Sequence, residues 1–77
     1  MDPIIISEFQ KNKTEDFRLA ITEYQGHTLL DFRIFFKDNE GESKPTKKGI
    51  TLNVKLFPEL KQAILDAEKI LTEKELL

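Results

Sequence analysis

The chain has 77 residues, with 12 lysines and arginines against 14 aspartates and glutamates, a net charge of −2 and no cysteine. This length predicts a single domain over residues 1–77 with a marginal core, because a chain of this size buries only about 60% of its unfolded surface. The lack of cysteine excludes disulfides, thiolate metal sites and thiol catalysis. The acidic balance argues against indiscriminate binding of polyanions. No apolar run approaches the roughly 20 residues that span a bilayer, and no signal-peptide pattern opens the chain, so we expect an intracellular protein of the cytoplasm or nucleoid, without membrane contact.

The first half of the chain predicts three strands. The β-branched run that begins at Ile4 indicates a strand over about residues 4–10, and residues 11–14 have the composition of a turn. Apolar and polar residues then alternate over residues 17–24, which is typical of a half-buried strand. Gln25-Gly26 forms a tight connection, and a third strand is expected over residues 27–37.

The second half predicts a short strand and a helix. Residues 38–41 are a turn signal, and Pro45 argues against a central strand at that point, so the fourth strand is expected only over residues 49–53. Asn53 is a good helix N-cap, and apolar spacing predicts an amphipathic helix over residues 54–72. Pro58 removes one backbone donor, which predicts an initial turn or kink before the regular helix. The resulting order, ββββα, indicates the α+β class.

The predicted helix has a broad apolar face made of two rows. We expect the row of Phe57, Leu60, Ile64, Ala67 and Leu71 to cover a face of the helix's own sheet. The adjoining row of Leu56, Ala63 and Ile70 is then left for a twofold partner. A lone core below about 70–80 residues seldom supplies more than ~3–5 kcal/mol, which favours a homodimer with the helices at or near the interface.

A basic segment beside aromatic residues is the strongest functional signal. Residues 32–37 combine Phe32, Phe35 and Phe36 with two cations, and residues 44–48 contain three lysines and no acid. Cations contact phosphates and flat rings stack on bases, so this pattern favours binding of an unpaired nucleic-acid strand.

Three segments of the chain share a known pattern. They are Tyr24-Gln25-Gly26, Leu30-Asp31-Phe32-Arg33, and residues 41–53, whose G-E-x-K-P-x-[KR]-K-G-I-[ST]-L-N pattern is the most specific. From Tyr24 to about Ile64 the sequence therefore resembles the single-stranded-DNA-binding domain of the transcriptional coactivator positive cofactor 4 family, in a compact prokaryotic- or phage-type form. The resemblance implies a curved four-stranded antiparallel sheet followed by a helix, association of two subunits, and single strands running along the exposed sheet surfaces.

The resemblance also implies roles for individual residues. Tyr24 would be a stacking aromatic after the second strand, Arg33 a phosphate contact, and Phe36 would take the place of a stacking tryptophan. The basic loop would line the path of the strand with Lys44, Lys47 and Lys48. We also expect Lys13, in the predicted first turn, to be a nucleic-acid contact.

Each of these assignments has a plainer alternative. The lysines fit an ordinary solvated loop, Arg33 fits a pair with Asp31 or Glu23, and Tyr24 fits a partly buried anchor. Strict alternation points Phe36 away from Arg33 and into the core unless a bulge or the strand end redirects it. Both orientations of Phe36 remain open at this point.

The sequence offers no catalytic constellation. His27 is the one histidine and there is no cysteine, so a structural zinc site is not expected, and the serines have no evident base partner. We therefore expect a non-enzymatic protein without cofactor or metal. It would bind single-stranded DNA with little sequence specificity, in transcription regulation or DNA maintenance, with the transcription machinery as a further partner. The alternatives are binding of RNA or a melted duplex, and a protein-interaction module that uses the helix.

Overall fold

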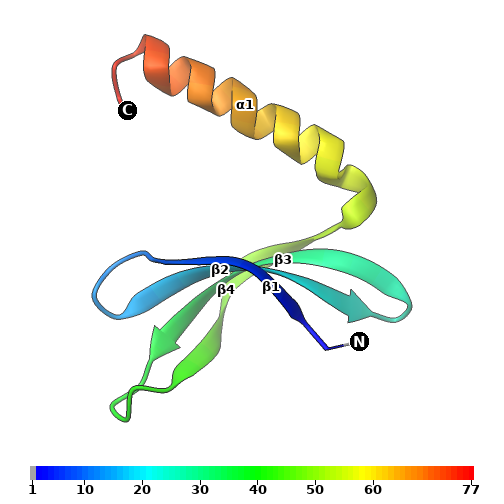
Figure 1. Ribbon diagram of the computed structural model, residues 1–77, viewed down its shortest axis with the longest axis vertical. Coiled ribbons are helices and arrows are strands. Elements are labelled where there is room, and N and C mark those ends of the chain that lie inside the picture. Colours follow the sequence, from blue (N-terminus) through cyan, green and yellow to red (C-terminus); the bar gives the residue numbers. More distant parts are fainter. Residues whose placement is uncertain (1) are drawn as a thin grey trace.

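A computed structural model of the chain describes residues 2–77 as a four-stranded sheet followed by one helix. The strands are β1 (Ile4–Gln10), β2 (Glu15–Tyr24), β3 (His27–Lys37) and β4 (Ser43–Asn53), and the helical segments are η1 (Val54–Leu56) and α1 (Phe57–Glu73). All neighbouring strands pair antiparallel in the order β1-β2-β3-β4 (Figure 1). The predicted four-stranded antiparallel sheet with a C-terminal helix is confirmed. β2 begins two residues earlier than expected.

The β2–β3 hairpin follows from its two turn residues. Gln25 and Gly26 both have positive φ values, 49° and 80°. A two-residue loop of this handedness matches the twist of the strands that it joins. The turn places Tyr24 directly opposite His27 and fixes the register along the whole of β2 and β3.

The sheet has one apolar and one polar face. Direct cross-strand pairs place Phe17, Leu19, Ile21, Leu30, Phe32 and Ile34 together on what we call the apolar face. The opposite face, called here the polar face, carries Arg18, Ala20, Thr22, Asp31 and Arg33. Among the described residues only Ala20, at 6% exposure, and Leu30, at 7%, are buried apolar side chains. The apolar face is therefore largely uncovered within one protomer.

β4 is longer than predicted, and the prediction of residues 49–53 was wrong at its start. The strand begins at Ser43 and includes Pro45, which lies opposite Phe35. β4 is an edge strand, so the missing N–H of proline interrupts no central ladder. Between the pairs Arg33–Gly49 and Phe35–Pro45 the register shifts, so that Thr46, Lys47 and Lys48 lie opposite Ile34 alone. This three-residue segment is called the β4 bulge below.

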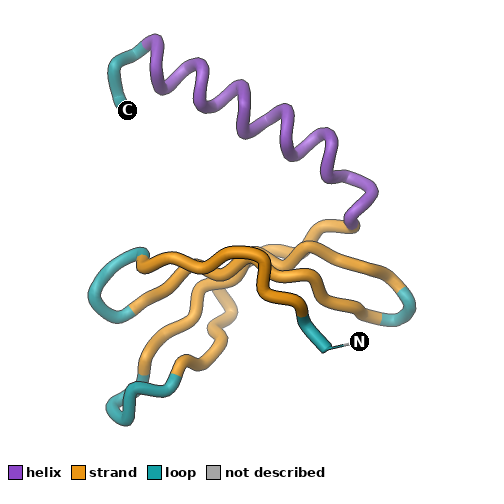
Figure 2. The backbone as a smooth tube through the Cα atoms, viewed as in Figure 1, coloured by secondary structure: helices purple, strands orange, loops and turns teal. Residues whose placement is uncertain are grey.

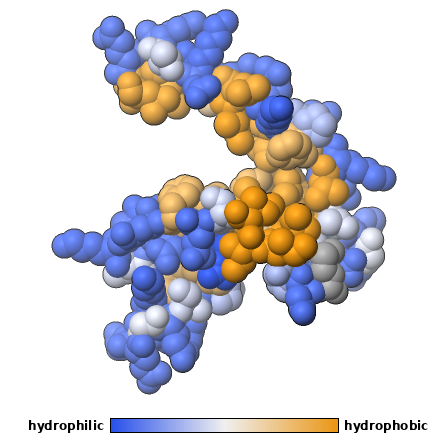
Figure 3. Space-filling view, in the orientation of Figure 1, coloured by the Kyte–Doolittle hydropathy of each residue, from blue (hydrophilic) through white to orange (hydrophobic). Residues whose placement is uncertain are grey.

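The other edge strand, β1, carries a smaller irregularity. Its register against β2 shifts between Ile5 and Ser7, which leaves Ile6 without a partner. The side chains of Ile4, Ile5 and Ile6 are all exposed. Figure 3 shows the apolar atoms gathered at the centre of the molecule and along the helix.

The start of the helical region confirms the expectation drawn from Pro58. The Asn53 side chain accepts a hydrogen bond from the Lys55 N–H at 2.9 Å and caps the single 3₁₀ turn η1. The α-helix then begins at Phe57, with Pro58 in its first turn, where a backbone donor is not needed. Within residues 2–77, no helix is both long and apolar enough to cross a membrane.

The helix does not cover its own sheet, and the expectation that one apolar row would do so was wrong. η1 touches β3, whereas α1 makes no extensive contact with any strand and leads away from the sheet (Figures 1 and 2). None of the α1 side chains is buried, and Ile64 is 57% exposed. The radius of gyration is 14.7 Å, against about 11.5 Å for a compact domain of this length. η1 directs α1 away from the sheet (Figure 1).

Gly49 gives a test of how β3 and β4 are joined. A Cβ atom placed on Gly49 would lie 2.3 Å from the Phe32 carbonyl oxygen and 3.1 Å from the Arg33 Cα. We expect Gly49→Ala to push the strands apart and to lower the free energy of unfolding by about 1–3 kcal/mol, the range for overpacked sites. Urea denaturation measures this loss. Ser43→Ala, in the same strand without such a contact, is the control, and equal stability of the two variants would contradict the close approach.

Candidate nucleic-acid interface

The β4 bulge is held by hydrogen bonds to the backbone of β3. The Thr46 hydroxyl donates to the Ile34 carbonyl oxygen at 2.7 Å and accepts from the Lys48 N–H at 3.1 Å. Arg33 adds a bond from Nη1 to the Thr46 carbonyl oxygen at 3.2 Å. With its backbone fixed in this way, the bulge presents the exposed side chains of Lys47 and Lys48 to solvent.

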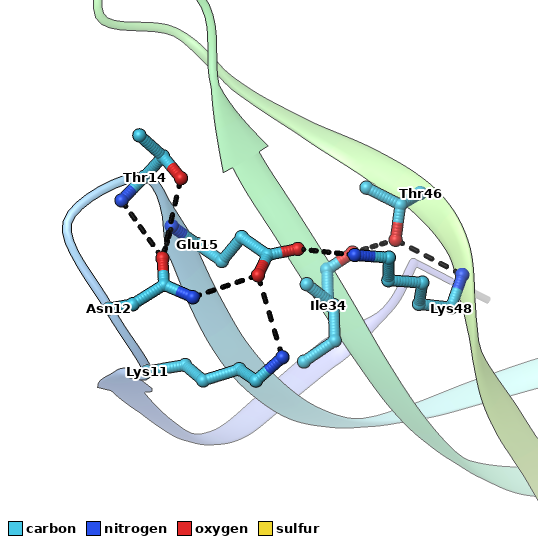
Figure 4. Close-up of polar contacts among 7 residues, drawn as sticks. All are labelled: Lys11, Asn12, Thr14, Glu15, Ile34, Thr46 and Lys48. Atoms are coloured by element: carbon cyan, nitrogen blue, oxygen red, sulfur yellow. Dashed lines mark hydrogen bonds and ion pairs between the residues drawn. The ribbon is translucent and has the colours of Figure 1, made fainter.

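A carboxylate on β2 organises the cations at this end of the sheet. Glu15 Oε2 lies 3.0 Å from Lys48 Nζ, and its Oε1 lies 2.9 Å from Asn12 Nδ2 and 3.4 Å from Lys11 Nζ (Figure 4). Asn12 in turn accepts from the N–H groups of Thr14 and Glu15, at 3.0 and 2.8 Å, which closes the β1–β2 turn. Side chains from the β1–β2 turn, β2 and β4 therefore meet in one polar network.

Two carboxyl groups in this region are strongly acidic. Hydrogen bonds from Asn12 and then from Lys48 lower the pKa of Glu15 to about 2. The backbone N–H of Glu42, with those of Glu40 and Gly41 and the side chain of Lys44, lowers the pKa of Asp38. Both groups are fully ionised near neutral pH and act as fixed negative charges beside the lysines.

Three of the predicted nucleic-acid cations are paired with acids in the protomer. Lys48 pairs with Glu15, Lys44 Nζ lies 3.3 Å from Asp38 Oδ2, and Arg33 lies 3.1 Å from Asp31 Oδ1. The pair with Asp31 is one of the alternatives that the sequence left for Arg33. Within residues 2–77, Lys47 and Lys13 form no ion pair. A phosphate that meets Lys44 or Lys48 must therefore compete with a carboxylate, whereas at Lys47 it need not.

The structure gathers most of the predicted cations at one end of the sheet. Lys44, Lys47 and Lys48 lie on β4 near the β3–β4 turn. The β1–β2 turn, which contains Lys13, lies beside them, because the Lys37 N–H donates to the Thr14 carbonyl oxygen at 3.1 Å. Tyr24 lies at the other end of β2, at the β2–β3 hairpin, and the residue is 65% exposed. The plain alternative of a partly buried anchor does not describe Tyr24 in the protomer.

The two faces of the sheet divide the remaining residues. Arg33 pairs with Arg18 and Gly49 on the polar face, whereas Phe36 pairs with Glu15 and Lys44 on the apolar face. The β4 bulge does not redirect Phe36, because the regular register resumes at Phe35–Pro45. Phe36 is 39% exposed at the end of β3, so its ring is neither in a core nor beside Arg33.

Sequence reasoning missed two residues of this region, Glu15 and Arg18. The Arg18 guanidinium lies 3.8 Å from the centre of the Phe35 ring and donates to the Glu8 carboxylate. Strand alternation alone places Arg18 on the same face as Ala20 and Thr22, so that signal was available. The contact between Glu15 and Lys48 spans 33 positions of the chain and depends on register, so no local pattern indicates it.

The chain is thus a four-stranded antiparallel meander with a basic bulged edge, followed by a single helix that leaves the sheet uncovered. The model of the family described as Transcriptional Coactivator p15 (PC4) matches residues 11–63, and the chain belongs to this DNA-binding family. Its members are non-enzymatic transcriptional coactivators and DNA-binding proteins.

Curated relatives support the assignment. The chain is 31% identical over 72 residues to the RNA polymerase II transcriptional coactivator KIWI of Arabidopsis thaliana, covering 94% of this chain and 63% of that protein. It is 34% identical over 67 residues to the RNA polymerase II transcriptional coactivator SUB1 of Saccharomyces cerevisiae, covering 86% of this chain but 22% of SUB1. The chain thus spans less than two thirds of these relatives.

Solved structures agree with the fold. A PC4 homologue from Burkholderia pseudomallei, in its orthorhombic crystal form, superposes with a TM-score of 0.76 at 30% identity, covering 83% of this chain and 86% of that one. The bacteriophage T5 homologue, described as implicated in recombination-dependent DNA replication, gives a TM-score of 0.66 at 27% identity, covering 100% of this chain and 85% of the other. The structural neighbours are therefore bacterial and phage homologues.

The acidic network predicts a pH dependence of stability. The folded-state pKa of Glu15 is about 2, below its ordinary value of 4.5, so its stabilising contribution is present above pH 4.5 and is lost as the pH falls toward 2. We expect the free energy of unfolding to fall over this interval, and to fall less steeply in Glu15→Gln. Urea denaturation at a series of pH values measures both slopes. Asn12→Ala, which removes the first bond to this carboxylate, should resemble Glu15→Gln, and parallel curves for all three proteins would refute the assignment.

Proposed function

We propose that this protein binds single-stranded DNA with little sequence specificity. The observation that carries the proposal is that residues 41–53, the most specific part of the sequence pattern, contain the β4 bulge. Hydrogen bonds fix the backbone of this bulge, which presents Lys47 and Lys48 to solvent. Clustered cations release counterions from a polyanion without reading its bases. Lys44, Lys47, Lys48 and Lys13 are the phosphate contacts at this end of the sheet, with Arg33 on the polar face.

Stacking supplies the preference for unpaired strands. The exposed ring of Tyr24 offers a platform to one base, and base stacking tolerates any sequence because every base has a π face. Phe36 is the second candidate platform, beside Lys44 at the other end of β3. Tyr24 lies on the polar face at the β2–β3 hairpin, whereas Phe36 lies on the apolar face at the other end of β3. A DNA strand that stacks on both rings therefore passes from one face to the other at the end of the sheet.

The uncovered helix supports a homodimer. A folded monomer of 9.0 kDa exposes about 4,850 Å², whereas the protomer exposes 6313 Å². The surplus, roughly 2,900 Å² for two protomers, lies within the range of obligate dimer interfaces, about 2,000–5,000 Å². The partner covers the apolar side of α1 and the middle of the apolar face, around Leu30 and Phe32, and leaves Phe36 and Lys44 at the end of the sheet to the DNA. The dimer then presents two DNA-binding surfaces to one strand.

The cellular role is proposed from the relatives. Two curated relatives are named as RNA polymerase II coactivators, and the phage homologue is described as implicated in DNA replication. Transcription regulation, with contacts to the transcription machinery, and DNA maintenance are the two settings in which a binder of unpaired strands acts. RNA, which also offers unpaired bases and phosphates, is the alternative ligand, and a melted duplex is a further one.

A salt titration tests the nucleic-acid site. Each phosphate contact on a single strand contributes about −0.7 to the slope of log K against log salt concentration. Lys47→Ala combined with Lys48→Ala should weaken binding to all sequences alike and flatten this slope by about 0.7–1.4. Fluorescence anisotropy with labelled oligonucleotides measures affinity, and a duplex of the same length should bind more weakly than the single strand.

The matched control removes the same charge elsewhere. Lys61→Ala with Lys69→Ala takes two exposed lysines from α1 and should leave the slope unchanged. If the double variant of the β4 bulge kept the wild-type affinity and slope, the assignment of Lys47 and Lys48 as phosphate contacts would be wrong. Equal affinity for duplex and single strand would point to generic electrostatics instead.

A single charged substitution tests the dimer. Ile64 is 57% exposed in the protomer, so a monomer would tolerate Ile64→Asp, whereas a dimer that buries this side chain would dissociate or unfold. Sedimentation equilibrium should give twice the protomer mass of 9.0 kDa for the wild type. Gln62→Asp introduces the same charge on the same helix and should leave the mass unchanged. A folded wild-type monomer at micromolar concentration would contradict the dimer.

A further inference from the structure

The polar face of the sheet contains a hollow over Ala20, and none of the three lysines of residues 44–48 lines it. Its volume is about 320 Å³, at the lower end of the range of ligand sites, roughly 300–1,000 Å³. Ala20 forms the floor, with Ile5 on β1 and Asp31 on β3 as its direct cross-strand neighbours. The rest of the wall is formed by Pro3, Arg18, Thr22, Arg33 and Phe35. The hollow exists because the smallest side chain on this face stands among longer ones from three strands.

Two arginines stand side by side at this hollow. Arg18 and Arg33 are direct partners across β2 and β3, and like charges in that position destabilise a sheet. Each has its own carboxylate: Arg18 donates to Glu8, and Arg33 donates from Nε to Asp31 Oδ1 at 3.1 Å. The Arg18 guanidinium carbon also lies over the Phe35 ring, 3.8 Å from its centre. The guanidinium groups are therefore fixed in place, and the charges around the hollow cancel.

Inside the hollow, charge and shape together favour a neutral ligand over a phosphate, so the phosphate that we assign to Arg33 lies outside the hollow, at its rim. A phosphate would gain two cations but would also meet the Asp31 carboxylate on the same wall. Ile5 provides an apolar side that a phosphate cannot use. Within residues 2–77, Asp31 Oδ2 and both Nη atoms of Arg18 take part in no hydrogen bond. The hollow thus offers one strong acceptor and a set of donors beside an apolar wall.

We propose that this hollow receives one nucleobase of the bound single strand and favours a base with an exocyclic amino group. The proposal rests on the proposed function. Tyr24, Thr22 and Ala20 share one face of β2, so the hollow lies about 13 Å along the strand from the stacking platform. A strand stacked on Tyr24 therefore runs toward it. The Asp31 carboxylate accepts from the amino group of cytosine, and it repels thymine, which has a carbonyl oxygen at the same position.

Two oligonucleotides of equal length test the proposal. We expect the wild type to bind oligodeoxycytidine more tightly than oligothymidine, by about fivefold or more. Asp31→Asn exchanges a pure acceptor for a group that both donates and accepts, so the preference should collapse toward equal affinity. If the hollow takes a phosphate, or no part of the DNA, loss of this negative charge should strengthen binding to both strands by the same factor and leave their ratio unchanged. That result would overturn the proposal.

A second variant tests the hollow by its volume. Ala20→Val fills the floor with a residue that suits a strand, and it should weaken binding of oligodeoxycytidine toward that of oligothymidine. Thr51→Val introduces the same side chain on the same face of the sheet, on β4, at a residue that does not line the hollow, and it should keep the wild-type preference. If Ala20→Val fails to fold, the ratio of the affinities of Asp31→Asn for oligodeoxycytidine and oligothymidine tests the proposal by itself. Tight binding of both strands with equal affinity by the wild type would refute the base site alone, whereas binding of neither would refute the proposed function as well.

Discussion

The close passage of Gly49 along the β3 backbone is the constraint on which the arrangement of the cations depends. At this point β4 returns to register after three residues that face only Ile34, and no side chain fits between the strands. The bulge is fixed on one side by this contact and on the other by Pro45. The Thr46 hydroxyl and Arg33 bind the backbone between them. Because the backbone of the bulge is fixed, its lysines keep their positions relative to β2, and Lys48 reaches Glu15 across the sheet.

The acids beside these cations account for the unusual charge balance of the molecule. A DNA-binding domain with a net charge of −2 cannot attract polyanions through its overall field. In the free protomer, the pairs of Lys48 with Glu15 and of Lys44 with Asp38 hold the two lysine side chains in position and neutralise their charges. In the proposed binding mode, affinity then depends on local geometry rather than on total charge.

Much of the fold could be predicted because its causes are local. The alternation of apolar and polar residues predicted β3, and the Gln25-Gly26 pair predicted the hairpin. Asn53 and Pro58 together predicted the turn that precedes the helix. The extent of β4 could not be predicted, because the tolerance for Pro45 depends on its place at the sheet edge. The packing of α1 could not be predicted either, because an amphipathic pattern shows that a helix has an apolar face but not which surface covers that face. In the candidate site, alternation correctly separated Arg33 from Phe36, whereas the carboxylate partners from other strands depend on register that no local pattern encodes.

The irregularity in β1 has a consequence for how the protein behaves at high concentration. A meander has two free edges, and β1 offers unpaired backbone groups together with three exposed isoleucines. A flat edge of that composition would template pairing with other chains. The unpaired Ile6 breaks the spacing of the edge and increases its local twist. A straight incoming strand therefore matches this edge poorly, so the residue that interrupts the ladder also disfavours edge-to-edge pairing of the sheet with another chain.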